Sequence, residues 1–194
     1  MTGFIILAAG ASTRLGRHKQ KLVYKGKPLL QHAIQAALSL PNHSIVVVTG
    51  YDYKVVQEEI TSTNVQVAVN EQWQTGMASS IKCGMQALLN LQPQMEQVII
   101  MLCDQPFVTG EILSKLVREQ LSSGKPIVAS AYNKTVGAPV LFAQRYFTAL
   151  MLLSGQEGAR KLIQQHLDDV AQVPFPEGAI DIDTPEDVER LMKL

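Results

Sequence analysis

Short apolar runs alternate with amphipathic segments along most of this chain, and this alternation limits its possible folds more than any other feature. The strand-like runs are Phe4–Ala8, Ile45–Thr49, Val65–Val69, Val98–Leu102 and Ile127–Ser130. Segments with helical spacing lie between them, at Leu29–Leu40, Lys54–Ile60, Met77–Leu91 and Glu111–Ser122. Strands that are apolar without a break are typical of sheets covered on both faces. The pattern therefore predicts an α/β fold with three layers, α/β/α, and a mostly parallel sheet.

The second half of the chain is less regular. It predicts a strand at Ala138–Ala143 and two helices at Gln144–Leu153 and Glu157–Leu167. Two isoleucines alternate with two aspartates over Ala179–Asp183, which indicates another strand. A helix is expected directly after it, with Thr184 as the N-cap and Pro185 at the first helical position.

Composition and charge narrow the class of protein. The chain has 194 residues, 46% of them apolar and 18% charged, which fits one domain over residues 1–194. Its formal net charge is zero, so no overall field attracts nucleic acid or an anionic membrane. The first cation, Arg14, follows the first apolar run, which is the wrong order for an export signal. With two well-separated cysteines, the sequence predicts a cytoplasmic protein that binds neither nucleic acid nor membrane.

A loop of small and basic residues follows the first predicted strand. Ala9-Gly10-Ala11-Ser12 lets backbone N–H groups approach an anion closely. Four cations come next in the sequence, at Arg14, Arg17, Lys19 and Lys21. Because ligands of open α/β sheets bind at the carboxyl ends of strands, this loop is a candidate polyphosphate site. The P-loop and dinucleotide-binding motifs are absent, and a loop of merely solvated cations is the alternative interpretation.

Two aspartates are candidate metal ligands. Asp104 directly follows the buried run Val98–Leu102, where a carboxylate is well placed to hold Mg²⁺. Asp183 lies between the last predicted strand and its helix, so it would bind metal or cap that helix. Asp181 is its rival as a ligand, because alternate residues of a strand share a face.

Three further residues are candidates for nucleotide contact. Asn70 ends the third predicted strand, and Gly76 and Ser79 lie at the start of the next helix. N–H groups at a helix start bind anions, but a serine there caps the helix equally well. For Trp73, the sequence favours a packing role over stacking on a ligand.

The stretch Leu7-Ala8-Ala9-Gly10-x-Ser12-x-Arg14-x-Gly16-x-x-Lys19 resembles the signature of the MobA-like nucleotidyltransferases. Within that family it is most similar to the molybdenum cofactor cytidylyltransferase branch. The likeness continues, in the family's order, at Gly26-Lys27-Pro28-Leu29-Leu30, Gly76-Met77-Ala78-Ser79-Ser80, Cys103-Asp104-Gln105-Pro106, Gly137-x-Pro139-Val140-Leu141-Phe142, Gly158-Ala159-Arg160 and Asp181-Ile182-Asp183-Thr184-Pro185-Glu186-Asp187. It thus covers nearly the whole chain.

The resemblance implies a nucleotide-diphospho-sugar transferase-like fold and roles for individual residues. Backbone groups of Leu7, Ala8, Ala9 and Gly10 would meet the base and phosphates of a nucleoside triphosphate. Arg14 would hold the leaving phosphates, and Lys19 would lie at the α-phosphate. Asp104 and Asp183 would bind Mg²⁺, while Asn70, Gly76 and Ser79 would contact the nucleotide. Arg160 would lie toward the second substrate, or be an ordinary surface arginine.

The resemblance also implies an activity. It is transfer of CMP from CTP to the terminal phosphate of molybdenum-bound molybdopterin, which gives molybdopterin cytosine dinucleotide and pyrophosphate. Ala9 favours CTP, since guanylyl relatives more often have glycine there. The resemblance further implies a transient contact with a molybdenum hydroxylase that receives the product. The alternatives are another phosphorylated acceptor such as a sugar phosphate, GTP as donor, or a non-catalytic cofactor-binding chaperone.

Overall fold

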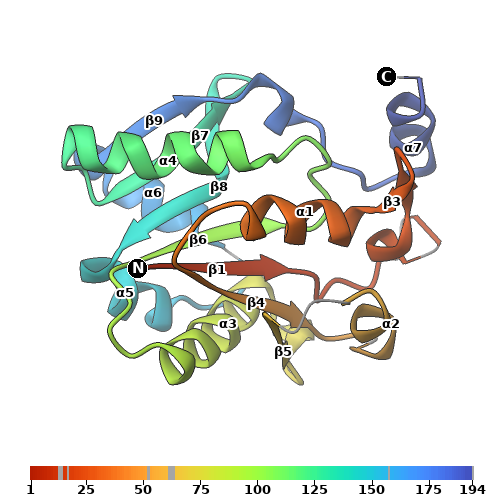
Figure 1. Cartoon of the computed structure of the whole chain (residues 1–194), viewed down its shortest axis with the longest axis horizontal. Coiled ribbons are helices and arrows are strands. Elements are labelled where there is room, and N and C mark those ends of the chain that lie inside the picture. The colour runs from red at the N-terminus through yellow and green to blue at the C-terminus, as the bar shows by residue number, and fades with distance from the viewer. Residues whose placement is uncertain (13–14, 17, 52, 61–63, 157, 194) are drawn as a thin grey trace.

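A seven-stranded sheet with helices on both faces forms the centre of the molecule (Figure 1). The computed structural model describes residues 1–194 except 13, 14, 17, 52, 61–63, 157 and 194. The strand order is β5-β4-β1-β6-β8-β7-β9. The bounds of these strands, in chain order, are β1 Thr2–Leu7, β4 His43–Thr49, β5 Val65–Val69, β6 Gln97–Leu102, β7 Ile127–Tyr132, β8 Thr135–Ala143 and β9 Val170–Pro174. A separate small hairpin consists of β2 Val23–Tyr24 and β3 Lys27–Pro28.

The helices follow the predicted pattern closely in the first two thirds of the chain. They are α1 Leu29–Leu38, α2 Tyr53–Glu58, α3 Met77–Leu91, α4 Gly110–Ser123, α5 Phe147–Leu152, α6 Arg160–Gln165 and α7 Pro185–Leu191. The predicted helices from Leu29 to Ser122 and the five strands from Phe4 to Ser130 are all confirmed, with small shifts at their ends. The three-layer α/β/α fold class is confirmed as well.

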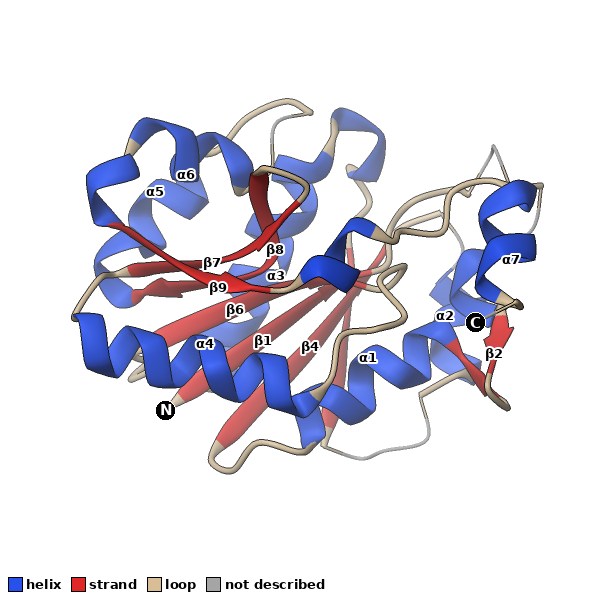
Figure 2. Ribbon diagram, turned by 90° about the horizontal axis from the view of Figure 1, so that it is seen from above, coloured by secondary structure: helices blue, strands red, loops and turns tan. Residues whose placement is uncertain are grey.

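Strand β1 shows why the apolar runs are unbroken. Phe4 and Ile6 pack on one face with α1 and α4, while Ile5 and Leu7 pack on the other with α3, α5 and α6. Figure 2 shows the sheet between these two helix layers. Because both faces are covered, successive residues are all buried and the alternation of a half-exposed strand is absent.

The sheet is parallel except at β8. Strands β5, β4, β1 and β6 run parallel to one another, and β7 and β9 form a second parallel pair. Strand β8 is antiparallel to both of its neighbours, β6 and β7, and so joins the two parallel groups. The register of the β7–β8 pair shifts between Ala129 and Ser130. On one side, the carboxyl end of β6 therefore lies next to the first part of β8 rather than next to the end of a parallel strand, whereas β1 has parallel neighbours on both sides.

The predicted strand over Ala179–Asp183 is wrong. A 3₁₀ turn occupies Pro176–Ala179, and the extended residues after it join no sheet. One backbone bond, from Ile182 N–H to the carbonyl of Asp104 at 3.1 Å, ties this segment to the end of β6. Isoleucine and aspartate alternate in this segment because Ile182 is buried against α7, the helix that follows. The last strand is instead β9, an exposed edge strand ending at Pro174, whose weak apolar pattern gave no signal.

A third apolar cluster lies beyond the carboxyl ends of the central strands. The hairpin β2–β3, the start of α1 and helix α7 pack there around buried Ile182 (Figures 1 and 2). Leu15 and Leu22, which flank the basic part of the opening loop, are buried in the same cluster. The last segment of the chain is thereby held next to the loop that follows β1. No helix in the described part of the chain has the length and apolar character needed to cross a membrane.

Candidate active site

A cleft of about 480 Å³ opens where β1 and β6 end. Most of the residues that the sequence analysis selects line it, namely Leu7, Ala8, Ala9, Gly10, Lys19, Gly76, Asp104 and Asp183. They come from four parts of the chain that are far apart in sequence. Arg14, the other predicted phosphate ligand, lies outside the described residues. The cleft thus brings together the opening loop and both predicted metal ligands.

The backbone of the opening loop is held by bonds from its surroundings. Leu7 and Ala9 accept through their carbonyl oxygens from the N–H groups of Cys103 (3.2 Å) and Tyr51 (3.5 Å). The N–H of Ala8 donates to the carbonyl of Val48 at 2.8 Å, which continues the β1–β4 pairing beyond the strand. Gly10 is exposed, with open space where a Cβ would lie. A ligand can therefore approach the backbone closely at Gly10.

Gln20 supports this loop from beneath, a role that the sequence analysis missed. Its side chain is buried, and its amide donates to the carbonyls of Ala8 at 2.8 Å and Gly10 at 3.4 Å. A glutamine between two lysines looks like an ordinary solvated residue in sequence. Only the fold shows that the chain turns at Lys19–Lys21 and directs Gln20 inward.

Lys19 forms two ion pairs with the candidate metal ligands. Its Nζ lies 2.7 Å from Oδ2 of Asp104 and 2.6 Å from Oδ1 of Asp183. The three side chains are only 12%, 17% and 29% exposed, respectively, so solvent screens these pairs incompletely. Burial disfavours the charged form of Lys19, but the carboxylates outweigh it, and the pKa of Lys19 lies above its ordinary value. The lysine therefore stays protonated and adds a positive charge to the cleft near neutral pH.

Local structure explains how Asp183 reaches this position. Thr184, not Asp183, is the N-cap of α7, and it forms a capping box with Asp187. The N–H of Asp183 also donates to Oδ2 of Asp187 at 3.2 Å. The interpretation of Asp183 as the helix cap is therefore wrong, and its carboxylate turns toward Lys19. Asp181 lines the same cleft, whereas the carboxylates that Lys19 contacts are those of Asp104 and Asp183.

The carboxylates fit a divalent cation. Oδ1 of Asp104 is buried and has no hydrogen-bond partner among the described residues. A buried acceptor without a partner is costly, and a cation would satisfy it. The described residues contain no group of three or more His, Cys, Asp or Glu side chains that would hold a metal alone. Two carboxylates suit Mg²⁺, which usually keeps waters and shares oxygens with its substrate.

Cys103, next to Asp104, takes no part in this chemistry. Its thiol is buried, and burial together with the Asp104 charge raises its pKa to about 12. The thiol therefore stays protonated near neutral pH and is not a nucleophile. Cys103 is thus a small buried residue that packs like an apolar one.

The opposite wall is formed by the start of α3. Gly76 lines the cleft with a φ of +116°, and a Cβ there would lie 2.4 Å from the carbonyl oxygen of Gly155. Asn70 donates to the hydroxyls of Ser79 (2.8 Å) and Ser80 (3.0 Å), and Ser79 donates back to the carbonyl of Gly76 (2.8 Å). Asn70 and Ser79 thus belong to a buried network behind the cleft, whereas Ser80 lines it. Their predicted contact with a nucleotide stays a prediction.

An aromatic row forms part of the rim. Trp73 lines the cleft and meets Tyr51 edge to face, with ring centroids 5.6 Å apart. Tyr51 in turn lies 6.3 Å from the ring of His18. Gly50 permits this packing, because a Cβ there would lie 2.5 Å from Cβ of Trp73. Trp73 therefore both packs, as the sequence favours, and faces the cleft.

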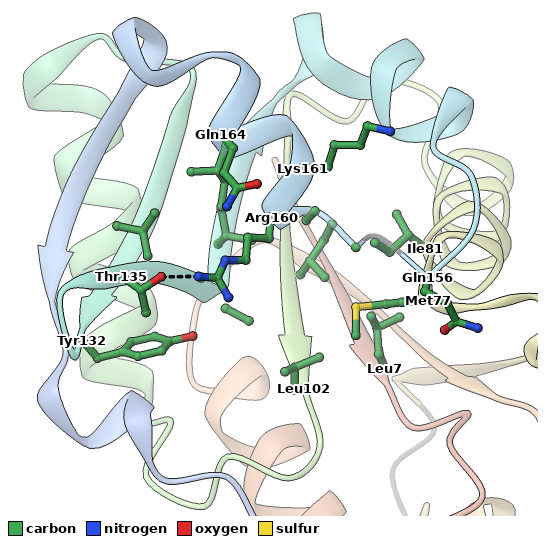
Figure 3. A pocket seen from close by; sticks show the side chains of 18 residues that line it. Leu7, Met77, Ile81, Leu102, Tyr132, Thr135, Gln156, Arg160, Lys161 and Gln164 are labelled. Carbon is green, nitrogen blue, oxygen red and sulfur yellow. Dashed lines mark hydrogen bonds between the residues drawn. The ribbon is translucent and has the colours of Figure 1, made fainter.

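A second cavity of about 420 Å³ adjoins the cleft (Figure 3). The two share four lining residues, Leu7, Met77, Leu102 and Gln156. Its other walls are largely aliphatic and come from α3, α6 and the antiparallel strand β8. Arg160 reaches across it and donates from Nη2 to Oγ1 of Thr135 at 2.7 Å, close to Tyr132 in Figure 3. The site is thus a charged cleft beside an apolar pocket with an arginine in its wall.

Known proteins resemble the chain along most of its length. The family model of the MobA-like NTP transferase domain matches residues 4–170. Nicotine blue oxidoreductase from Paenarthrobacter nicotinovorans is 28% identical over an alignment of 201 residues, 97% of this chain and 95% of that protein. The bifunctional protein GlmU from Cutibacterium acnes is 34% identical over 121 residues, 60% of this chain. The match spans only 28% of that GlmU.

Solved structures share the complete fold. Rv0371c from Mycobacterium tuberculosis H37Rv has a TM-score of 0.85 at 27% identity and covers 100% of this chain and 97% of its own. A structure of Rv0371c in complex with manganese has a TM-score of 0.77 at 25% identity, with 100% and 98% covered. Structures below 25% identity, among them one described as a nucleotidyl transferase, have the same fold.

Proposed function

The chain belongs to the MobA-like NTP transferase domain family, and we propose that it transfers CMP from CTP to the terminal phosphate of molybdenum-bound molybdopterin. The products of this reaction are molybdopterin cytosine dinucleotide and pyrophosphate. We assign the activity to residues 1–194 as a single nucleotidyltransferase domain that uses Mg²⁺. A molybdenum hydroxylase that receives the product is the proposed transient partner.

The position of Lys19 between Asp104 and Asp183 carries this proposal. Nucleotidyl transfer needs positive charge at the α-phosphate and a metal on the phosphate oxygens, rather than a covalent intermediate. The cleft has one fixed cation and two carboxylates within hydrogen-bond distance of each other. A relative named as an oxidoreductase aligns along nearly the whole chain, so family membership alone does not select the reaction. This charged group favours phosphoryl chemistry.

Each charged residue of the cleft has a separate proposed role in the reaction. Lys19 is proposed to neutralise the charge that develops at the α-phosphate as the bond to pyrophosphate breaks. Asp104 and Asp183 would hold Mg²⁺, which supplies charge that orients the phosphate oxygens for in-line attack. A phosphate acceptor is anionic near neutral pH, so the reaction requires no general base. Arg14 keeps its proposed role on the leaving phosphates.

CTP as the donor is supported by the end of β1. Ala9 is 7% exposed and belongs both to the wall of the cleft, where the nucleotide is proposed to bind, and to the apolar cluster beneath it. Glycine in its place would leave more room for a larger purine base. GTP therefore remains the alternative donor, and a Gly substitution at Ala9 is the direct way to test the steric effect.

The second cavity supports an acceptor that has a ring system as well as a phosphate. Its aliphatic walls suit a heterocycle, and Arg160 suits the phosphate that this acceptor must carry. The cavity adjoins the cleft through Leu7 and Leu102, so an acceptor there has direct access to the α-phosphate. A sugar phosphate is the alternative acceptor, whose hydroxyl groups could bond to polar side chains of the same wall such as Tyr132, Gln156 and Gln164.

The test mixes purified protein, Mg²⁺ and molybdenum-loaded molybdopterin with each nucleoside triphosphate in turn. Mass spectrometry of the products should show the cytosine dinucleotide, and its formation should require Mg²⁺. A guanine dinucleotide would keep the chemistry and overturn the role of Ala9. If folded protein makes no dinucleotide, a panel of sugar phosphates would follow. Failure with that panel as well would leave the non-catalytic chaperone as the better hypothesis.

A further inference from the structure

The ammonium of Lys19 lies in the space that a divalent cation needs. It contacts one oxygen of Asp104 and one of Asp183 at 2.7 and 2.6 Å, as a metal bridging the two carboxylates would. In the proposed function, the same ammonium has to contact the α-phosphate while the same carboxylates hold the metal. One lysine cannot occupy both positions at once.

We propose that Lys19 is an internal counter-ion that the divalent cation displaces, and that its move from the carboxylates to the phosphate couples metal binding to nucleotide binding. This inference rests on the proposed function and adds an order of events to it. Without nucleotide, the metal competes with Lys19 for Asp104 and Asp183. With nucleotide, the phosphates attract Lys19 away and the metal enters more easily.

When no metal is bound, the two carboxylates need another positive charge beside them. Asp104 and Asp183 are both partly buried, and each contacts the same ammonium. Without that charge, two carboxylates close together in a poorly solvated cleft would repel each other. Asp181 lines the same cleft and adds a third carboxyl group there. Lys19 therefore stabilises the metal-free protein.

The structure permits Lys19 to move without moving the loop. Its backbone N–H donates to Oγ of Ser12 at 3.2 Å, and the next residue, Gln20, is buried and bonded to Ala8. The backbone is thus fixed on both sides of the Lys19 side chain. The flexible four-carbon stem of a lysine can still rotate and carry its point charge to a new partner. The cleft that contains both carboxylates also contains Gly10, where phosphate is proposed to approach.

If the metal displaces Lys19, removal of this lysine should strengthen the binding of metal alone and weaken the coupling between metal and nucleotide. A variant with a neutral residue at position 19 should bind the metal alone more tightly than the wild type does, because no ammonium competes for the two carboxylates. In the same variant, nucleotide should raise the affinity for metal less than it does in the wild type, because nucleotide binding releases no lysine from the carboxylates. Coupling is reciprocal, so nucleotide should also bind with less help from metal in the variant.

The experiment titrates Mn²⁺ into the protein of residues 1–194 and follows free Mn²⁺ by electron paramagnetic resonance, without nucleotide. Lys19→Met should bind Mn²⁺ roughly tenfold more tightly than the wild type, within the usual range for coupled sites. Lys21→Met is the matched control. It removes the same charge two residues away, where the lysine pairs with Glu58 at 2.6 Å on the surface. Its Mn²⁺ affinity should equal that of the wild type.

The results separate failure of this inference from failure of the proposed function. Equal or weaker Mn²⁺ binding by Lys19→Met, in protein whose circular dichroism matches the wild type, overturns the counter-ion role. If Lys19→Met does not fold, Lys19→Gln provides the same comparison. Persistence of the tighter binding in Lys19→Met/Asp104→Asn also overturns it, because the ion would then bind elsewhere. If the wild type binds no Mn²⁺ even with CTP, the metal-dependent function itself fails.

A second titration, with CTP present and no acceptor, measures the coupling. In the wild type, CTP should raise Mn²⁺ affinity more than it does in Lys19→Met. The phosphates themselves add metal ligands in both proteins, so only the difference between the two reports the release of Lys19. An equal increase in both proteins would show that Lys19 does not connect the two sites.

Discussion

The two adjoining cavities of this protein are built in different ways. The cleft is lined by charged side chains and by backbone at the ends of β1 and β6, two adjacent parallel strands. The neighbouring pocket is lined mainly by aliphatic side chains from β8, α3 and α6, with Arg160 among them. In the cleft, the charges already contact one another. In the pocket, the arginine donates to a neutral hydroxyl, that of Thr135.

This difference indicates where reaction chemistry and substrate choice reside. Paired charges in the cleft suit any phosphate transfer, because they act on groups that all nucleoside triphosphates share. The shape and single arginine of the pocket act on the part of the acceptor that differs between substrates. We therefore expect changes in the cleft to reduce turnover with every acceptor, and changes in the pocket to alter KM for one acceptor.

The largest expected effect is that of Asp104→Asn. Loss of this carboxylate charge should reduce turnover by about a hundredfold or more, as loss of one charge contact in a transition state commonly does. Steady-state assays of CMP transfer, with circular dichroism to confirm folding, measure this. Asp181→Asn is the matched control in the same cleft and should retain most activity. The reverse order of effects would make Asp181 the metal ligand.

A smaller and more selective effect is expected for Arg160→Gln. Because a hydrogen bond to a charged group contributes ~1.5 kcal/mol or more, KM for the acceptor should rise about tenfold. The affinity for CTP, measured by quenching of the single tryptophan, Trp73, should not change. Lys161→Gln is the control, because Figure 3 shows the Lys161 side chain directed away from Thr135. A loss of kcat with unchanged acceptor KM would remove the distinction between the two cavities.

The smallest effect is expected for Asp187→Ala, which removes the capping box of α7. Loss of such a cap typically costs ~1 kcal/mol, and here it also removes the bond to the backbone of Asp183. The hydroxyl of Thr184 holds the pKa of Asp187 below its ordinary value of 3.8. A lowered pKa stabilises the fold above pH 3.8, and this contribution is lost as the pH falls through the lowered value.

Thermal unfolding at several pH values tests this prediction. The wild type should lose the contribution of Asp187 on acidification, whereas Asp187→Ala should lack that part of the pH dependence. Mn²⁺ affinity should also fall slightly in the variant, since Asp183 is less well held. KM for the acceptor should not change. An effect on the acceptor alone would show that α7 supports the pocket rather than the cleft.

Much of the cleft could be predicted because its residues follow buried strands. Residues directly after β1 and β6 lie at the same edge of the sheet, so Gly10 and Asp104 could be expected close together, whereas the position of Lys19 depends on the path of the loop. The second cavity could not be predicted in this way. Its walls depend on the antiparallel placement of β8 and on α6, and the sequence pattern sets neither the order of strands nor the crossing of a hairpin.

The sequence by itself determined the alternation of strands and helices, the covered sheet and the acidic and basic residues at its edge. Hydrophobic period and strand ends are local properties, and local physics is sufficient to recognise them. Only the tertiary structure decided that Lys19 lies between Asp104 and Asp183 and that Gln20 supports the loop. It also showed that residues 180–183 form no strand. These outcomes depend on contacts between segments far apart in the chain, which follow from packing of the whole molecule rather than from any single stretch.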